Sequence, residues 1–381
     1  MRLRVLACGF AMLWGSGVAD ARNCPEGAFE NFPPGEATAV GFDPAVLADA
    51  IGDLRRSDRD IRSLLVVKDC KLVVELYRVG LGRDFAHSMY SVAKSFVVTL
   101  AGILVREGKL SLDAPLTMAL DRPVGIADAT WARAGHVRVR HVFGMLSGYE
   151  YVHTPTSHPL YTVMDRRQIA LLPGTEAAPG TRFNYSDADA VLAAATVAKA
   201  AGRDLLAFAR DALFKPLGFR EVEWWYRDHA GLYHAGGGLR VRPMDAAKLG
   251  QLYLQRGLWD GHEIIAPSFV EEVWRAGPNP NYGLFWWRTS SDNGFFARGW
   301  KGQRVFVFPE FELVIATTAH MDDDNSSDLH SAVRKIVSAL REKRSGVVTE
   351  GSQALRRELA QPFDGNIPGP VPLPEDRPGK L

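Results

Sequence analysis

Apolar positions with helical spacing recur along the chain and predict a series of helices. Residues 91–107 are apolar almost all round, which is typical of a helix that is buried on every side, and Gly108 is a good stop residue for it. Residues 187–201 are rich in alanine and predict another helix, which ends at Gly202. Weaker or shorter patterns predict helices over residues 47–57, 139–146, 168–172, 205–214, 243–255 and 329–343.

Strand patterns lie near both ends of the chain. Residues 63–67 and 72–77 are rich in β-branched and aliphatic side chains and flank a short polar turn, which predicts an antiparallel hairpin. Residues 282–289, 295–299, 304–308 and 313–318 predict further strands. The fold class is therefore α/β in content (α+β): one antiparallel sheet built from both ends of the chain and flanked by helices, with a helical subdomain inserted at about residues 110–235.

The first residues have the features of a secretory signal peptide. Arg2 and Arg4 precede an uncharged run over residues 5–19, and a small-x-small pattern follows it. This predicts cleavage after Ala21, a periplasmic or secreted location, and no stable membrane insertion after cleavage. A lipoprotein that uses Cys8 and a buried N-terminal helix are the alternatives.

Composition beyond the signal divides the chain into three parts. Residues 22–42 predict an extended lead-in, residues 43–344 one globular domain, and the Pro-rich residues 345–381 a flexible or surface-hugging tail. The 46% hydrophobic and 23% charged residues exclude disorder for the bulk of the chain. A net charge of +1 gives no reason to expect nucleic acid as a partner, because that would call for a strongly basic domain.

Two cysteines, Cys24 and Cys70, would remain after signal cleavage. An even number in an oxidising compartment permits one disulfide between them, and two unpaired thiols are the alternative. Cys70 belongs to a polar turn, which predicts a position near the surface.

The clearest candidate chemistry lies at the start of the first buried helix. Ser91 and Lys94 lie one helical turn apart and therefore share a face. A serine is a weak nucleophile unless a base takes its proton, and burial can remove the charge of a lysine. The helix N-terminus adds partial positive charge where an oxyanion would develop. Alone the S-x-x-K pattern is weak, since an ordinary helix with a solvated lysine also fits it.

Two other segments carry candidate residues. A polar run that includes Tyr185 and Asp187 precedes the alanine-rich helix, and Tyr185 is a plausible acid or base only if a cation such as Lys94 lies near it. The segment from Trp300 to Gln303 leads into a predicted strand, where a free N–H could complete an oxyanion hole with the N–H of Ser91. Read alone, each segment also fits a capping turn or a strand bend.

Known metal and cofactor motifs are missing from the sequence. The histidines show neither H-E-x-x-H nor a Cys/His zinc spacing, and there is no G-x-G-x-x-G or P-loop pattern. The mature chain has no G-x-S-x-G elbow, which argues against an α/β-hydrolase. No metal and no cofactor are therefore expected.

Taken together and in order, the motifs resemble the serine β-lactamase and penicillin-binding protein superfamily. Within it they are most similar to the class C β-lactamase-like branch, which includes family VIII carboxylesterases, D-amino-acid peptidases and 6-aminohexanoate-dimer hydrolases. The matching segments, from about residue 64 to residue 340, include S-V-A-K at 91–94, G-K-L-S-L-D-A-P at 108–115, H-V-F-G-M-L-S-G at 141–148, Y-S-D at 185–187, K-P-L-G-F at 215–219, A-G-G-G-L at 235–239 and W-K-G-Q at 300–303.

The resemblance implies a role for each matching residue. Ser91 would be the acylated nucleophile, Lys94 and Tyr185 the proton-transfer pair, and the backbone N–H groups of Ser91 and Gln303 the oxyanion hole. Which of Lys94 and Tyr185 acts as the base stays open. Asp187, Trp300, Lys301 and Gly302 would contact the substrate.

Two departures from the family pattern favour an esterase or amidase over a dedicated β-lactamase. Asp187 stands where β-lactamases usually carry asparagine, and an ionised carboxylate cannot donate to a substrate carbonyl. It could instead meet a cationic substrate such as a free amine. Trp300, Lys301 and Gly302 stand where Lys-Thr-Gly is usual, and strand alternation would turn Lys301 to the face opposite Trp300.

We therefore expect a secreted or periplasmic serine hydrolase that forms a covalent acyl-enzyme with a small ester or amide. One alternative is a β-lactamase or D,D-carboxypeptidase that acts on cell-wall peptides. The other is a non-catalytic binding protein of the same fold.

Overall fold

The computed structural model describes residues 24, 31–57, 59–152, 160, 164–220, 222–321, 327–341 and 348–364. The predicted signal peptide, most of the first half of the lead-in and the last 17 residues of the predicted tail lie outside the described residues. None of the helices in the described part of the chain is both long enough and apolar enough to cross a bilayer.

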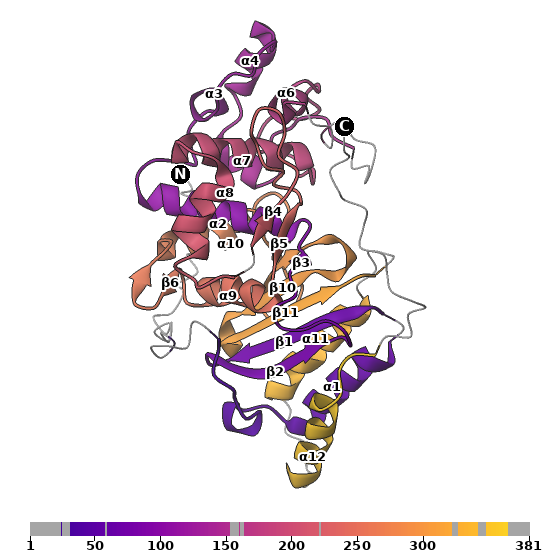
Figure 1. The fold of residues 1–381 in the computed structure, drawn as a ribbon. Helices are drawn as coiled ribbons and strands as arrows, with labels where there is room; N and C mark the ends of the chain where they lie inside the picture. The colour runs from indigo at the N-terminus through magenta and orange to yellow at the C-terminus, as the bar shows by residue number, and fades with distance from the viewer. Residues whose placement is uncertain are drawn as a thin grey trace, which may run out of the picture.

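A six-stranded antiparallel sheet joins the two ends of the chain, as the sequence predicts (Figure 1). Its strand order is β2-β1-β11-β10-β9-β8, so the N-terminal hairpin pairs through β1 with the last strand. The strands are β1 (Ile61–Lys68), β2 (Lys71–Tyr77), β8 (Trp287–Arg288), β9 (Phe295–Arg298), β10 (Arg304–Phe308) and β11 (Leu313–Ala319). The strand predicted over residues 282–289 is reduced to β8.

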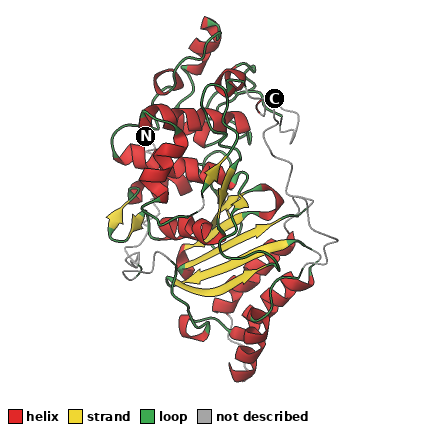
Figure 2. Ribbon diagram, in the orientation of Figure 1, coloured by secondary structure: helices red, strands yellow, loops and turns green. Residues whose placement is uncertain are grey.

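Both faces of this sheet are buried, which explains why β1 is a continuous apolar run instead of an alternating one. Leu64 and Val66 pack in one core with the helices α1 (Pro44–Arg56) and α11 (Ser327–Arg341). Leu65 and Val67 pack in the second core, on the opposite face, with α2 (Val92–Arg106), α7 (Asp187–Ala201) and α9 (Pro243–Leu254). The sheet thus separates a small helical layer from a large helical region (Figure 2).

Helix α9 lies directly on the sheet because Gly250 lets it approach closely. A Cβ at Gly250 would lie 2.6 Å from a methyl group of Val314 and 2.8 Å from one of Val305. Beyond α9, the large helical region contains α3 (Leu116–Ala119), α4 (Asp128–Ala134), α5 (Val139–Phe143), α6 (Arg166–Leu171), α8 (Leu205–Ala209), the π-helical turn η3 (Arg210–Phe214) and α10 (Pro267–Trp274).

Two small sheets and three short 3-10 helices complete the described fold. The first sheet has the order β3-β5-β4 (His87–Ser88, Leu239–Val241 and Glu223–Trp224), and the second pairs β6 (Leu258–Trp259) with β7 (His262–Glu263). The 3-10 helices are η1 (Thr38–Val40), η4 (Trp300–Gly302) and η5 (Pro309–Phe311). The first small sheet helps to position the candidate residue Ser91, because β3 ends just before it.

The predicted tail contains a helix, α12 (Val348–Leu359), that packs against α1. Leu355 is buried in the core that includes α1, and Arg55 of α1 forms an ion pair of 3.0 Å with Glu358. This described part of the predicted flexible or surface-hugging tail is therefore a helix docked on α1, because a few apolar side chains on one helical face suffice for docking even when the segment is polar on average.

Cys24 and Cys70 form a disulfide, with a Cα–Cα distance of 5.4 Å. Cys70 is buried instead of lying near the surface. Its turn leaves the sheet edge, but Cys24 and the side chain of Gln251 on α9 cover its sulfur atom.

Candidate active site

Ser91 lies at a sharp strand-to-helix turn. Strand β3 pairs with β5, the Met89 N–H donates to the Leu239 carbonyl at 2.9 Å, and α2 begins immediately after Ser91. Tyr90 has a φ of 47°, a left-handed conformation that is uncommon for a non-glycine residue and that is frequent at functional sites. Ser91 is partly exposed at the N-terminal end of the buried helix.

Lys94 lies within hydrogen-bonding distance of the serine hydroxyl. Its Nζ lies 2.8 Å from Ser91 Oγ, and its side chain is only 1% exposed. Ser91 Oγ also lies 3.3 Å from the carbonyl oxygen of Gly236, to which it can donate its own proton. The predicted proximity of Ser91 and Lys94 is therefore present as a direct hydrogen bond.

Helix α7 and the segment before it contribute Asp187 and Tyr185 to the site. Ser186 caps α7, with its Oγ accepting from the Asp189 N–H at 3.2 Å, so that Tyr185 precedes the helix and Asp187 begins it. Lys94 Nζ lies 4.9 Å from the centre of the Tyr185 ring and 2.7 Å from Asp187 Oδ1. The structure thus brings Ser91, Lys94 and Tyr185 together, although they are distant in sequence.

The charge state of Lys94 follows from its neighbours. Burial lowers the pKa of Lys94, but the negative charge of Asp187 and the smaller contribution of Tyr185 outweigh burial and raise its pKa above the ordinary value. Lys94 is therefore an ammonium group, which donates hydrogen bonds and accepts none.

Asp187, which is predicted to contact a cationic substrate, is buried and paired within the protein. It is 2% exposed, its Oδ1 pairs with Lys94, and its Oδ2 accepts a hydrogen bond of 3.4 Å from the Tyr151 hydroxyl. An internal lysine thus already neutralises the carboxylate, and contact of Asp187 with a substrate stays a prediction.

The segment from Gly299 to Gln303 lies against the turn that carries Ser91. A Cβ at Gly299 would lie 2.3 Å from the Met89 carbonyl oxygen, and the rings of Tyr90 and Trp300 meet edge to face at 5.5 Å. The Gln303 side chain is fixed by a 2.7 Å hydrogen bond from its Nε2 to the Ala319 carbonyl. The Gly299 N–H donates to the Gln303 carbonyl at 2.9 Å, which ties Gln303 to the segment that packs against the Ser91 turn, and the oxyanion-hole role of its N–H stays a prediction.

Lys301 and Trp300 are not arranged as strand alternation predicts. Residues 300–302 form the 3-10 turn η4 instead of a strand, and Lys301 has a φ of 60°. Lys301 Nζ consequently lies 4.9 Å from the centre of the Trp300 ring and 2.9 Å from His320 Nε2. A cation therefore does accompany the half-exposed Trp300, while Gly302 supplies a left-handed turn (φ 94°) and is itself buried.

Three residues near the cluster around Ser91 were not predicted as site residues. Tyr151 donates to Asp187, and no pattern in the sequence singles it out. His234 and Gly236 lie close to the Asp187 carboxylate, since a Cβ at Gly236 would be 2.7 Å from His234 Cε1 and 2.6 Å from Asp187 Oδ1. The triple glycine at 236–238 was the available signal for a close backbone approach.

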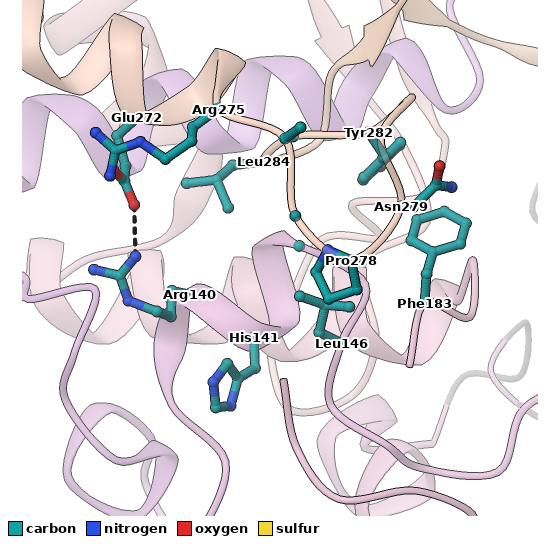
Figure 3. Close-up of a pocket in the computed structure, with 14 residues that line it drawn as sticks. Arg140, His141, Leu146, Phe183, Glu272, Arg275, Pro278, Asn279, Tyr282 and Leu284 are labelled. Carbon is teal, nitrogen blue, oxygen red and sulfur yellow. Dashed lines mark hydrogen bonds and ion pairs between the residues drawn. The ribbon is translucent and has the colours of Figure 1, made fainter. Parts of the chain in front are cut away.

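A separate pocket with a volume of about 190 Å³ lies between α5 and the segment that follows α10 (Figure 3). Its charged groups satisfy one another, because Glu272 pairs with Arg140 at 2.5 Å and with Arg275 at 2.6 Å. Phe183 and Tyr282 line it and also belong to the aromatic cluster that supports Tyr185. The pocket therefore adjoins the packing of Tyr185 without including the serine.

Among the residues that the structure describes, no group of three or more His, Cys, Asp or Glu side chains is arranged to hold a metal ion.

Comparison with known proteins decides the family. A family model described as Beta-lactamase matches residues 62–338. The chain belongs to the beta-lactamase family. It is thus a hydrolase-family protein of the serine β-lactamase and penicillin-binding protein superfamily, as the sequence motifs predict.

Several known proteins are similar to this chain. A 6-aminohexanoate-dimer hydrolase from Paenarthrobacter ureafaciens is 22% identical over 355 residues, covering 83% of this chain and 86% of that protein. A structure described as a candidate 6-aminohexanoate-dimer hydrolase from Bacillus anthracis is 20% identical with a TM-score of 0.66, covering 76% of this chain and 81% of that one. A family VIII carboxylesterase is 15% identical with a TM-score of 0.60, covering 78% of this chain and 97% of that one. These likenesses establish the β-lactamase fold.

Proposed function

We propose that this beta-lactamase family member is a serine hydrolase that acts on small esters or amides through a covalent acyl-enzyme. The hydrogen bond of 2.8 Å between Lys94 Nζ and Ser91 Oγ, beside the ring of Tyr185, carries this proposal. The descriptions of the relatives as an amide-dimer hydrolase and a carboxylesterase support the substrate class.

The proposed reaction begins at the partly exposed hydroxyl of Ser91. Its Oγ attacks the substrate carbonyl carbon while its proton passes to the Lys94–Tyr185 pair. The backbone N–H groups of Ser91 and Gln303 hold the oxyanion, helped by the partial positive charge at the start of α2. The pair then protonates the leaving alcohol or amine, and water releases the acid from Ser91 by the same steps in reverse.

A carboxylate-bearing substrate such as a β-lactam or a cell-wall peptide is the second candidate. The observation that favours it is Lys301 beside Trp300, since Trp300 packs on Tyr90 next to the serine and a cation on this segment could pair with a substrate carboxylate. Turnover of nitrocefin against turnover of short-chain p-nitrophenyl esters separates the two candidates.

The test of the serine mechanism compares Ser91→Ala with Ser111→Ala, a change in an exposed turn outside the cluster. Ser91→Ala should lower p-nitrophenyl ester turnover by several orders of magnitude, because it removes the attacking oxygen. Ser111→Ala should retain wild-type turnover. Retained turnover in a folded Ser91→Ala protein would overturn the proposal.

Export is part of the same proposal. A disulfide persists in oxidising compartments and is rare in the cytosol, so the Cys24–Cys70 bond supports export through the predicted signal peptide. Amino-terminal sequencing of the protein from a periplasmic or culture fraction should begin after Ala21. An exported protein that begins at Met1 would contradict it.

A further inference from the structure

Asp187 is the best-connected acidic group of the site, and its place in the fold favours the ionised form. It is the first residue of α7, where unpaired N–H groups and the helix dipole stabilise a negative charge. Its Oδ1 accepts from Lys94 at 2.7 Å, and its Oδ2 accepts from the Tyr151 hydroxyl at 3.4 Å. Both oxygens are therefore occupied by groups of the protein.

The ion pair determines what Lys94 can do for Ser91. With the Asp187 carboxylate at 2.7 Å, Lys94 stays protonated and donates to Ser91 Oγ at 2.8 Å. An ammonium cannot accept the serine proton until the cluster has lost a proton of its own. An amide at position 187 would leave this ammonium buried without a counter-charge, which favours the neutral amine.

We propose that Asp187 is a positioning residue that locks Lys94 as an ammonium donor to Ser91 and thereby sets the pH above which the serine becomes reactive. The proposal rests on the function proposed above. It concerns a feature of this chain, in which a carboxylate occupies the position where an amide is usual in β-lactamases.

Other titratable groups face the pair from several elements. His234 lies before β5, and burial lowers its pKa to about 4, so it is neutral throughout the range tested below. Burial raises the pKa of Asp189, on α7, to about 7, so this carboxyl titrates within that range. The remaining groups are Tyr151, Tyr185, Tyr282 and, beside His234, Arg166 of α6.

Asp189 provides a matched control because it lies on the same helix, is equally buried and carries the same functional group. Its Oδ2 accepts from the Ser147 N–H at 3.3 Å, whereas the Oδ1 of Asp187 faces Lys94. Exchanging acid for amide at the two positions therefore separates an effect on Lys94 from the general loss of a buried carboxylate.

The experiment measures the rate at which a fluorophosphonate probe labels Ser91 between pH 5 and pH 10, with mass spectrometry to identify the labelled residue. Such a probe reports the reactivity of the serine without knowledge of the substrate. In Asp187→Asn, the lowering effect of burial on the pKa of Lys94 is no longer opposed by the carboxylate. The midpoint of the acid limb should therefore move to lower pH by at least about one unit, which is tenfold in rate well below the midpoint.

Three further variants test whether the shift of the midpoint comes from the loss of the charge at position 187. Asp189→Asn should leave the midpoint at its wild-type value. Tyr151→Phe removes a donor from Asp187 but not the charge, so it should not lower the midpoint. Asp187→Ser, a second uncharged variant, should share the downward shift and serves if the asparagine variant does not fold.

An unchanged or raised midpoint in folded Asp187→Asn or Asp187→Ser would overturn the proposal. So would a shift of equal size in Asp189→Asn. These results differ from a failure of the proposed function, in which the wild-type protein itself would not be labelled at Ser91 at any pH.

Discussion

Gly236 is a position at which the addition of one methyl group should disturb the cluster around Ser91. A Cβ built there lies 2.6 Å from Asp187 Oδ1 and 2.7 Å from His234 Cε1, both closer than the 3.0 Å below which such contacts essentially do not occur. In Gly236→Ala the carboxylate oxygen that pairs with Lys94 must therefore retreat by at least about 0.4 Å. Gly236 needs no left-handed conformation, so steric crowding is the main effect.

The neighbouring Gly237 is a matched control, because a Cβ there meets no atom within 4 Å and its φ is not positive. Displacements of about 1 Å in an active site can cost a hundredfold in rate, so Gly236→Ala should lower kcat/KM for a p-nitrophenyl ester about 10- to 100-fold. Gly237→Ala should retain activity within about twofold, since a substitution that meets no clash and no strained conformation changes little. Thermal unfolding would check that both variants fold. Equal activity of the two folded variants would refute the reasoning about the Asp187–Lys94 contact.

Three further predictions concern stability. Cys70→Ser opens a loop with a sequence separation of 46 residues and should lower the free energy of unfolding by about 4 kcal/mol. Denaturant titration should show the same loss in the reduced wild-type protein. An unchanged denaturant midpoint in the variant would contradict the disulfide. Burial lowers the pKa of His234 to about 4, so its contribution to stability is complete above its unfolded pKa of 6.5 and is lost as pH falls towards 4. His234→Gln should therefore flatten the pH dependence of the melting temperature between pH 6.5 and pH 4. An equally steep dependence in the variant would contradict the buried, neutral state of His234. Burial raises the pKa of Asp189 from 3.8 to about 7, so its carboxyl lowers stability progressively as pH rises through that interval. In Asp189→Asn the free energy of unfolding should increase by roughly 2–4 kcal/mol at pH 8 and by little at pH 4. An increase of the same size at both pH values would contradict burial of the charge as the cause.

The main helices and the hairpin were predictable because local signals agree with their tertiary environment. Predicted residues 187–201 coincide with α7, where Ser186 caps the start and Gly202, in a left-handed conformation, ends the helix. The apolar run of α2 likewise predicted a helix buried on all sides. In these elements the pattern of apolar residues and the capping residues point to the same boundaries.

The details that the sequence could not predict depend on contacts between distant segments. The family motif placed Ser91, Lys94 and Tyr185 in one site, but Asp187 pairs with Lys94 because α2 and α7 pack with their N-terminal ends together. The side of Trp300 on which Lys301 lies depends on the left-handed φ of Lys301, and no residue type signals this conformation. Tyr151 reaches Asp187 from a loop whose sequence carries no recognised pattern.

The central claim is that Ser91 is the nucleophile of a covalent mechanism, and trapping the acyl-enzyme tests it most directly. The protein would be quenched in acid during turnover of a p-nitrophenyl ester, and its peptides would be analysed by mass spectrometry. The peptide that contains Ser91 should carry the mass of the acyl group, and this adduct should be lost in Ser91→Ala. Turnover without any adduct under conditions that accumulate the intermediate, or an adduct on another residue that persists in Ser91→Ala, would contradict the account.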